Sequence, residues 1–450
     1  MNPAHESRES DTTTARGFGH VFRALRFRNY RLFFGGQLIS LIGTWMQQIA
    51  LTWLVYRLTN SAFLLGLVGF AGQLPMFLLG PLAGVIADRL NKQRIVIITQ
   101  TLSMIQAGIL AVLTLTGTIA VWHIMVLSIF LGLINAFDMP TRQSFLLEMI
   151  ENKDELGNAI ALNSSMFNGA RLVGPSIAGL VIAAIGEGLC FFLNAVSYIA
   201  VIIALLAMKL PPRQHHQKKS RGMLVEFKEG FRYVIGFSTI RNILLLIALV
   251  SLAGMPYMVL MPVFAKDILL GGPNTLGFLM GAVGVGALSG ALILASRKNI
   301  IGLSRWIPFS ATVFGAGIIG FSFSRALPLS LVLLFIAGLG MMVQIASSNT
   351  IMQTIADDDK RGRVMSFYTM SFVGMTPFGS LLAGSLASSI GAPSTVFISG
   401  IVCIAGAIIF ALQLPSLRKQ IHPIYVKLGI IPEISSGIQT ASQLARPPAE

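Results

Sequence analysis

Charged residues are scarce in this 450-residue chain. Only 11% of its residues are Asp, Glu, Lys or Arg, whereas 54% are hydrophobic and the mean hydropathy is +0.75. Soluble domains usually contain about 25% charged residues. The composition therefore excludes an ordinary water-soluble globular protein, and its high apolar content excludes a disordered chain. An integral membrane protein is the class that remains.

Cysteine is also rare, with only Cys190 and Cys403, both inside apolar runs. Two such residues exclude a disulfide framework and a cysteine-based metal site. His215 and His216 are adjacent, but a histidine pair in a polar loop is more often solvated than bound to a metal. The chain has no Walker loop, metalloprotease motif or nucleophile elbow. We therefore expect no metal, no cofactor and no enzymatic activity.

We also expect no cleavable signal peptide, because residues 1–30 are polar and rich in arginine and the first long apolar run starts near Leu32. A helix needs roughly 20 mainly apolar residues to cross a bilayer. Breaks at Gly, Pro and charge clusters divide the chain into twelve predicted transmembrane helices. They cover residues 32–56, 62–87, 95–117, 121–147, 158–184, 187–208, 238–265, 273–296, 302–323, 327–353, 363–387 and 393–414.

The basic residues alternate between the predicted loops. With the N-terminus inside, the outer connections hold only Arg57, Lys266 and Arg325 of the 33 Lys and Arg residues. This bias predicts that both termini are cytoplasmic in a multi-pass protein of the cell membrane. Nucleic-acid binding is the alternative explanation of the net charge of +15. We expect no nucleic-acid partner, because the excess follows the loops.

A polar stretch interrupts the apolar pattern at residues 209–237. Within it, Leu224, Phe227, Phe231 and Val234 recur at helical spacing, which predicts an amphipathic helix on the membrane surface. The predicted organisation is a cytoplasmic segment (1–31), a six-helix bundle (32–208), the linker (209–237), a second six-helix bundle (238–415) and a flexible cytoplasmic tail (416–450).

The two predicted bundles are related in sequence. At an offset of 205 residues, five glycines of the first half fall on glycines of the second, and an offset of 206 aligns two more. An internal six-plus-six repeat is typical of transporters, with the binding site near mid-membrane between the halves. A channel is less well supported, because no filter-like segment is present. The aligned glycines are 157/362, 169/374, 174/379, 179/384, 186/391, 80/286 and 84/290.

The segment from Gly84 to Arg94 follows the second predicted span and reads Gly-Val-Ile-Ala-Asp-Arg-Leu-Asn-Lys-Gln-Arg. It resembles the signature loop of the major facilitator superfamily, Gly-x-x-x-Asp-Arg/Lys-x-Gly-x-basic-basic, except at Asn91 and Gln93. Asn tolerates the left-handed conformation that Gly supplies, so we expect the turn to be kept at Asn91. We also expect Gly80 and Gly84 to pack closely on a neighbouring helix.

The resemblance implies a conformational gate. In the superfamily the loop acid meets the N-terminus of span eleven, so Asp88 is expected to lock the two halves together on the cytoplasmic side when the protein faces outward. The alternative is that Asp88 only ends a helix and sets topology. The predicted gate residues are Gly84, Asp88, Arg89, Lys92, Arg94, Arg361 and Arg363.

A second segment, in the fifth predicted span, resembles the antiporter motif Gly-x-x-x-Gly-Pro-x-x-Gly-Gly. It contains Gly174, Pro175 and Gly179, with alanine at two of the family's glycine positions. The resemblance implies that this helix blocks leakage during exchange, while ordinary close packing is the alternative. The chain is most similar to a bacterial branch that includes multidrug, macrolide and siderophore exporters. The implied fold is all-α, with twelve helices in two pseudo-symmetric bundles.

Ionisable residues inside predicted spans are candidates for proton coupling. Asp138 and Arg142 are four residues apart and so share a helix face. We expect Asp138 to respond to protons while pairing with Arg142 and with Arg171 or Arg89, and Glu148 lies near the same helix end. A static ion pair that joins helices is the alternative.

The substrate cavity is expected between the halves, where methionine adapts to varied apolar shapes and aromatic rings offer stacking area. With few charged groups there, the cargo is expected to be amphipathic rather than a small anion. The predicted cavity residues are Gln37, Trp45, Gln47, Gln48, Asn135, Tyr257, Met258, Met261 and Gln344.

These observations predict a proton-coupled antiporter that exports small hydrophobic or amphipathic compounds by alternating access. Its expected partners are lipid, substrate and protons, and we expect a monomer. The alternatives are a dedicated exporter of a natural metabolite such as a siderophore, a uniporter or importer, and a membrane-embedded enzyme or lipid-handling scaffold.

Overall fold

The computed structural model describes residues 22–150, 155–209, 223–297 and 300–427, and in these ranges it contains only helices and their connections. The first half of the chain forms η2 (Arg23–Arg26), α1 (Arg28–Thr59), α2 (Ala62–Arg89), α3 (Lys92–Leu115), α4 (Val121–Met149), α5 (Leu156–Ile185) and α6 (Glu187–Leu206). The second half forms α7 (Met223–Gly236), α8 (Ser238–Leu249), η4 (Val250–Gly254), η5 (Met255–Met258), α9 (Met261–Val263), η6 (Phe264–Ile268), α10 (Pro273–Ala295), α11 (Leu303–Phe323), α12 (Leu327–Ile355), α13 (Arg361–Phe372), α14 (Thr376–Ile390) and α15 (Ala392–Lys427).

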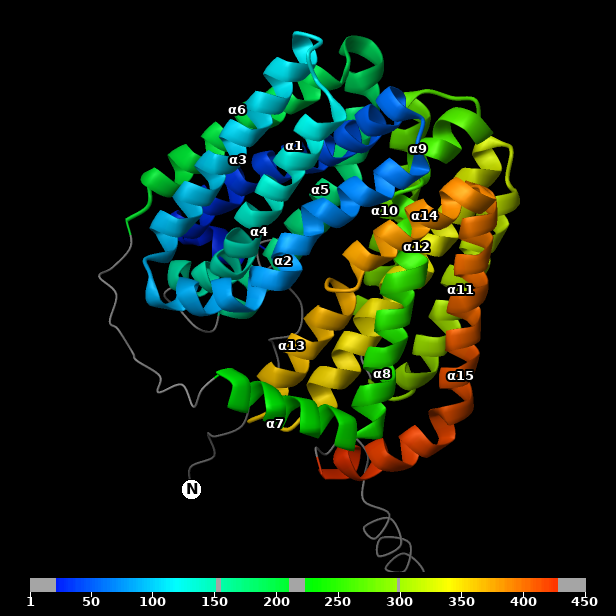
Figure 1. The fold of residues 1–450 in the computed structure, drawn as a ribbon. Coiled ribbons are helices and arrows are strands. Elements are labelled where there is room, and N and C mark those ends of the chain that lie inside the picture. Colours follow the sequence, from blue (N-terminus) through cyan, green and yellow to red (C-terminus); the bar gives the residue numbers. More distant parts are fainter. Residues whose placement is uncertain (1–21, 151–154, 210–222, 298–299, 428–450) are drawn as a thin grey trace, which may run out of the picture.

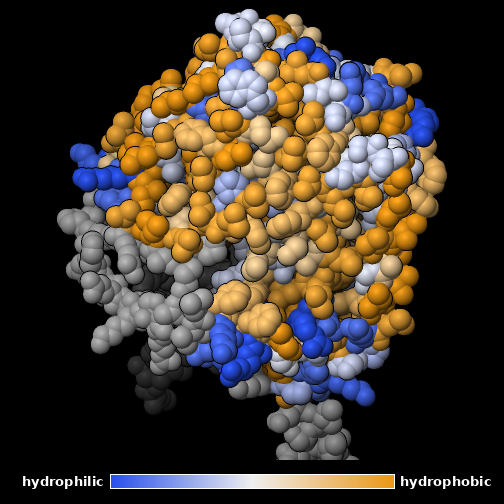
Figure 2. Space-filling model, in the orientation of Figure 1, coloured by the Kyte–Doolittle hydropathy of each residue, from blue (hydrophilic) through white to orange (hydrophobic). Residues whose placement is uncertain are grey.

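The described part of the chain contains twelve helical segments that are long and apolar enough to cross a bilayer, which confirms the predicted fold class. Their outward faces carry large apolar side chains, such as Leu206 and Leu412, that are 65% and 77% exposed. Hydrophobic residues cover the middle of the face in Figure 2, whereas hydrophilic residues gather toward its two ends. Such a surface needs lipid as its solvent.

The two halves stand side by side (Figure 1). α7 and the end of α15 lie at the bottom of that view, which we call the linker end, and the opposite end is called the sealed end. The helices of each half pack mainly on one another. Two helix pairs, α2 with α14 and α5 with α10, make most of the contacts between the halves.

The seventh and eleventh crossings are irregular. The seventh passes from α8 through π and 3-10 segments, where Pro256 and Pro262 each lack the N–H that a regular helix would use. The eleventh is interrupted between α13 and α14. Irregular backbone at membrane depth is tolerated where it is buried in protein or lines a cavity.

The repeat in the sequence corresponds to a repeat in the backbone. Gly186 and Gly391 both have φ +85° and join equivalent helices, α5 to α6 and α14 to α15. A side chain at Gly174 would meet α1, and one at Gly379 would meet Leu252 and Pro256 in the middle of the seventh crossing, the counterpart of α1. Equivalent glycines therefore serve equivalent contacts in the two bundles.

Two local expectations are corrected. Asn91 is not left-handed: with φ −71° and ψ 109° it is the N-cap of α3, and its Oδ1 accepts a hydrogen bond from Arg94 N at 3.0 Å. Its short polar side chain thus replaces a missing helical partner. α15 continues to Lys427, so residues 416–427 of the predicted tail are helical despite Pro415, while residues 428–450 lie outside the described residues.

Candidate functional site

Glycine contacts close the space between the halves at the sealed end. A Cβ placed on Gly179 of α5 would lie 3.0 Å from Gly277 Cα of α10, and one on Gly66 of α2 would lie 2.8 Å from Gly384 Cα of α14. These distances are too short for any side chain, so the backbones touch directly. We call these four residues the glycine seam. Gly179 belongs to the antiporter-like motif, whose Pro175 carbonyl also faces Gly277.

Polar contacts join the same end of the two halves. The Tyr56 hydroxyl donates to the Asp267 carboxylate, and Lys266 Nζ donates to Asn60 Oδ1 at 2.5 Å. Lys266 also lies over the Tyr56 ring, 5.5 Å from its centroid. Together with the glycine seam, these contacts hold α1, η6 and their neighbours together at this end.

The linker end is different, because the inner ends of the interface helices lack such contacts. A side chain built on Gly80 would meet nothing within 4 Å, and one on Gly84 would meet only Pro140, at 3.9 Å. Nearby Leu78 is 59% exposed. The expected close packing of Gly80 and Gly84 is therefore wrong for this conformation, since no neighbouring helix approaches Gly80 and only Pro140 lies near Gly84.

The gate residues Arg361 and Arg363 pair with acidic residues outside the predicted gate. Arg361 pairs with Asp358 at 2.7 Å, and Arg363 pairs with Glu229 of α7 at 2.8 Å. The side chains of Asp88 and Arg89 lie outside the described residues, so their contact with α13 stays a prediction. The backbone N–H of Arg94 donates a hydrogen bond to Asn91 Oδ1.

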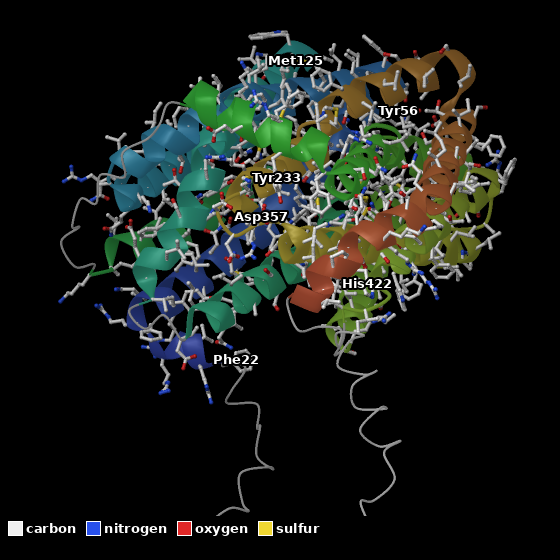
Figure 3. All side chains as sticks on the ribbon, turned by 90° about the horizontal axis from the view of Figure 1, so that it is seen from below. Phe22, Tyr56, Met125, Tyr233, Asp357 and His422 are labelled. Carbon is white, nitrogen blue, oxygen red and sulfur yellow. The ribbon has the colours of Figure 1, made fainter. Side chains whose placement is uncertain are left out.

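α7 occupies the linker end of α13. Phe227 and Phe231 both pack on Phe367 of α13, with ring centroids 5.2 and 6.2 Å away. Tyr233 accepts a hydrogen bond from Asp357 N at 3.3 Å, and the two residues lie together in Figure 3. Burial raises the pKa of the Tyr233 hydroxyl, which is therefore neutral at pH 7.

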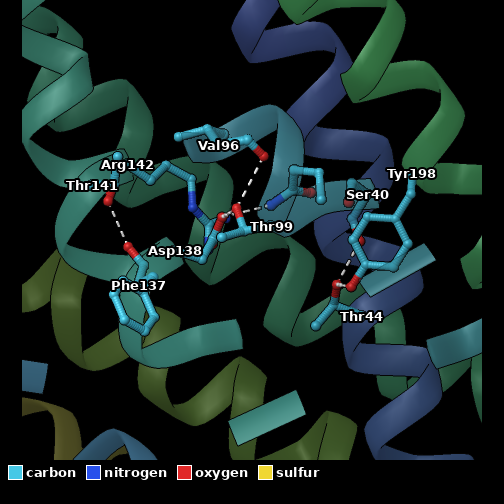
Figure 4. A network of polar contacts seen from close by, with 10 residues as sticks. Ser40, Thr44, Val96, Thr99, Phe137, Asp138, Thr141, Arg142 and Tyr198 are labelled. Carbon is cyan, nitrogen blue, oxygen red and sulfur yellow. Dashed lines mark hydrogen bonds and ion pairs between the residues drawn. The ribbon is translucent and has the colours of Figure 1, made fainter. Parts of the chain in front are cut away.

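Asp138 is the centre of a buried polar cluster in the first half (Figure 4). It is 2% exposed and accepts hydrogen bonds from Thr99 Oγ1 at 2.8 Å and Gln100 Nε2 at 2.9 Å, both on α3. Arg142 pairs with its other oxygen. Three side chains therefore converge on this one carboxylate, and the cluster ties α4 to α3.

Two predicted members of that cluster lie elsewhere. Glu148 forms an ion pair with Lys92 at 3.0 Å, nearer the linker end. Arg171 of α5 lies over the ring of Trp45 at 5.8 Å instead of beside Asp138. Within the described residues Arg171 has no ion pair or hydrogen bond, so its charge is matched mainly by an aromatic face.

Arg171 and Trp45 belong to a mid-membrane group that both halves supply. The Trp45 ring also packs edge-on against Phe167, with centroids 5.8 Å apart. Tyr257 of the second half lies near Arg171, and its buried hydroxyl has no partner in the described structure. Further buried polar atoms without a described partner belong to Gln37, Ser251, Gln344, Ser347 and Ser348.

Other predicted cavity residues are placed differently. Gln47 is 3% exposed and lies inside the first bundle, where it bonds to Gln106 at 3.0 Å and Asn194 at 2.8 Å. That assignment is therefore corrected, because its amide is consumed by helix packing. Met261 is fully buried, Met258 and Asn135 are half-buried, and Gln48 is exposed.

Sequence reasoning missed Phe167 and the serines at positions 251, 347 and 348. The signal was present for two of them, because Ser347 and Ser348 follow Gln344 by about one helical turn in an otherwise apolar helix. Phe167 gave no such signal, since aromatic residues in a span usually face lipid or a neighbouring helix.

Two linked halves of six crossings, closed at one end around a polar centre, define a membrane transporter of the major facilitator type. The chain belongs to the transmembrane secretion effector family, whose model matches residues 20–425. It is a multi-pass membrane protein of the bacterial transporter type and not an enzyme.

Three transporters match this chain over nearly their whole length. The staphyloferrin A transporter of Staphylococcus aureus is 28% identical over 84% of this chain and 95% of that protein. The multidrug efflux pump Tap of Mycolicibacterium fortuitum is 28% identical over 82% and 92%. The macrolide efflux protein A of Streptococcus pyogenes is 25% identical over 84% and 96%.

Solved structures show the same fold. A bacterial homologue of the human lysosomal transporter Spinster superposes with a TM-score of 0.67 and 15% identity, covering 89% of this chain and 98% of that one. A mutant of the nucleoside transporter NupG gives 0.66 and 11%, covering 87% and 99%.

Proposed function

We propose that the protein is a proton-coupled antiporter of the cell membrane that exports small hydrophobic or amphipathic compounds by alternating access. The observation that carries this proposal is the asymmetry of the interface between the halves. Gly179 packs on Gly277 at the sealed end, whereas Gly80 of α2 meets nothing at the linker end. This is the geometry of one end point of a rocking cycle.

The orientation of the cycle follows from the charge pattern. The linker end carries the basic connections, so the positive-inside rule makes it cytoplasmic. The described conformation is then inward-open, ready to take cargo from the cytoplasm or the inner leaflet. Two of the relatives are named as efflux proteins, which supports export over uptake. A single chain contains both halves, which supports a monomer as the transporting unit.

The mid-membrane group suits an amphipathic cargo. Trp45 and Phe167 supply aromatic surface, and Tyr257 and Gln344 supply polar atoms that have no partner in the described structure. Unpaired buried polar groups are costly, so a cargo that hydrogen-bonds to them gains both affinity and orientation.

Proteoliposomes test the transport reaction. Vesicles that contain the purified protein are loaded with a fluorescent amphipathic compound and given a proton gradient of each sign in turn. The protein should move the compound in the direction opposite to protons. A protonophore should stop this movement. Transport that continues unchanged with the protonophore present would identify a uniporter and overturn the coupling.

A dedicated metabolite exporter is the second candidate, supported by the likeness to the staphyloferrin A transporter. The two functions are separated in a deletion strain. Increased susceptibility to several unrelated drugs indicates a broad exporter. Unchanged susceptibility together with loss of one compound from the culture medium indicates a dedicated exporter.

A further inference from the structure

A cavity of about 320 Å³ lies at the linker end, outside the space between the halves. It is formed by the first turn of α11 and the last turns of α15, the part of α15 that extends beyond residue 415. We call it the basic cavity. Its lining includes Ser304, Arg305, Arg418, Ile421, His422 and Tyr425. Figure 3 shows His422 on α15, apart from the contact of α7 with Asp357.

The basic cavity concentrates positive charge without an acid. Arg305 and Arg418 are close enough to repel each other, and Arg418 Nε donates only a 3.4 Å hydrogen bond to Ser304 Oγ. Neither arginine forms an ion pair with any residue in the described ranges, and none of the described residues that line the cavity is acidic. Two like charges held side by side disfavour each other, and a bound anion removes that cost.

The backbone and the cavity wall add to this preference. α11 begins at the cavity, and its N-cap Gly302 provides no side-chain cap, so the positive end of a 21-residue helix adds to the arginines. Ile421 and Tyr425 are only 4% and 7% exposed and form an apolar wall beside the charges. Charge next to apolar surface at a membrane face fits the junction of a headgroup and an acyl chain.

We propose that the basic cavity binds a phosphate group, and in the membrane the phosphate of an anionic phospholipid. Arginine forms paired hydrogen bonds with phosphate oxygens, and two guanidinium groups with the Ser304 hydroxyl supply donors from two helices. A phospholipid bound there joins α11 to α15 and stabilises the second half at the linker end. Free inorganic phosphate is the other source of the same chemistry.

The test uses the full-length protein, purified in detergent and titrated with phosphatidylglycerol or phosphatidylcholine, with bound lipid counted by native mass spectrometry. Arg418→Gln is compared with Lys419→Gln, which removes one charge from the neighbouring exposed position that does not line the cavity. We expect Arg418→Gln to weaken phosphatidylglycerol binding about tenfold or more. Lys419→Gln should change it less than twofold, and Arg418→Lys should restore part of it.

Two further readouts complete the design. Thermal unfolding of each variant without lipid shows that the fold is kept, and Arg305→Gln gives an independent loss at the same cavity. Stabilisation of the wild type by millimolar inorganic phosphate, absent in Arg418→Gln, assigns free phosphate as a ligand. Equal losses in Arg418→Gln and Lys419→Gln, or equal binding of the two lipids by the wild type, would overturn the proposal.

Discussion

At the scale of single residues, hydrogen-bond partners distinguish functional groups from structural ones. Gln47 and Gln344 are both buried glutamines in apolar helices. Gln47 is paired inside one bundle, whereas neither amide atom of Gln344 has a partner in the described structure. The sequence could place both inside a span, but periodicity shows only which face a residue occupies and not what that face meets. The cavity could therefore be predicted only in part.

Asp138→Asn is the residue-scale test of proton coupling. The amide cannot be protonated, so export should lose its dependence on the proton gradient in vesicle assays. Removing the partner of partly exposed Arg142 should also cost about 1–3 kcal/mol of stability. Glu148→Gln, which breaks the pair with Lys92 in the same half, is the control and should keep the pH dependence. Normal pH-dependent export by Asp138→Asn would leave the cluster with a purely structural role.

Asn91 provides a second test, because the sequence predicts a turn residue there and the structure shows a helix cap. Asn91→Ala should destabilise the protein by about 0.5–2 kcal/mol, since the Arg94 N–H loses its acceptor. Asn91→Asp keeps an acceptor and should be nearly neutral. Thermal unfolding in detergent measures both. If Asn91→Gly is more stable than the wild type, the turn rather than the cap governs this position.

At the scale of elements, long helices were predictable and their interruptions were not. Twelve crossings follow from apolar length alone, because lipid forces the backbone to pair within each segment. The π and 3-10 segments between Val250 and Ile268 depend on how Pro256 and Pro262 settle against neighbouring helices. The extension of α15 beyond Pro415 depends in the same way on packing, with Leu417 and Ile421 buried.

The contact of α5 with α10 gives a prediction at this scale. Gly179→Val should push the helices apart, because the new side chain overlaps Gly277, and overpacking costs about 1–3 kcal/mol. That cost shifts the balance toward the conformation open at the sealed end by about 5- to 150-fold. Distances between spin labels on Thr116 and Leu270 measure the shift. Gly169→Val on the same helix, where nothing lies within 4 Å, is the matched control.

At the scale of the whole molecule, the pseudo-symmetry of the two halves is approximate. Gly286 of α10 is pressed against α12, where a Cβ would lie 2.0 Å from Phe335 O. Its repeat partner Gly80 on α2 meets nothing. The sequence correctly related the two glycines, but it could not predict that one is packed on a helix of its own half and the other is open, because a repeat relates backbone positions and not the side chains packed against them.

Gly80→Leu tests whether this surface closes during the cycle. The variant should fold and bind cargo from the linker end, because Gly80 faces open space here. It should lose most transport, since a bulky residue blocks the approach of the halves at that end. Gly108→Leu, another open glycine of the first bundle, should transport normally in proteoliposomes. Full transport by Gly80→Leu would show that α2 stays uncovered in both states.

The glycine seam determines how closure of the sealed end responds to ionic strength. Backbone contact between Gly179 and Gly277, and between Gly66 and Gly384, involves no formal charge, unlike the rim contacts of Lys266 and Asp267. Ionic strength weakens exposed charge pairs and leaves close backbone packing almost untouched. The sealed end should therefore stay closed when the ionic strength outside the cell rises.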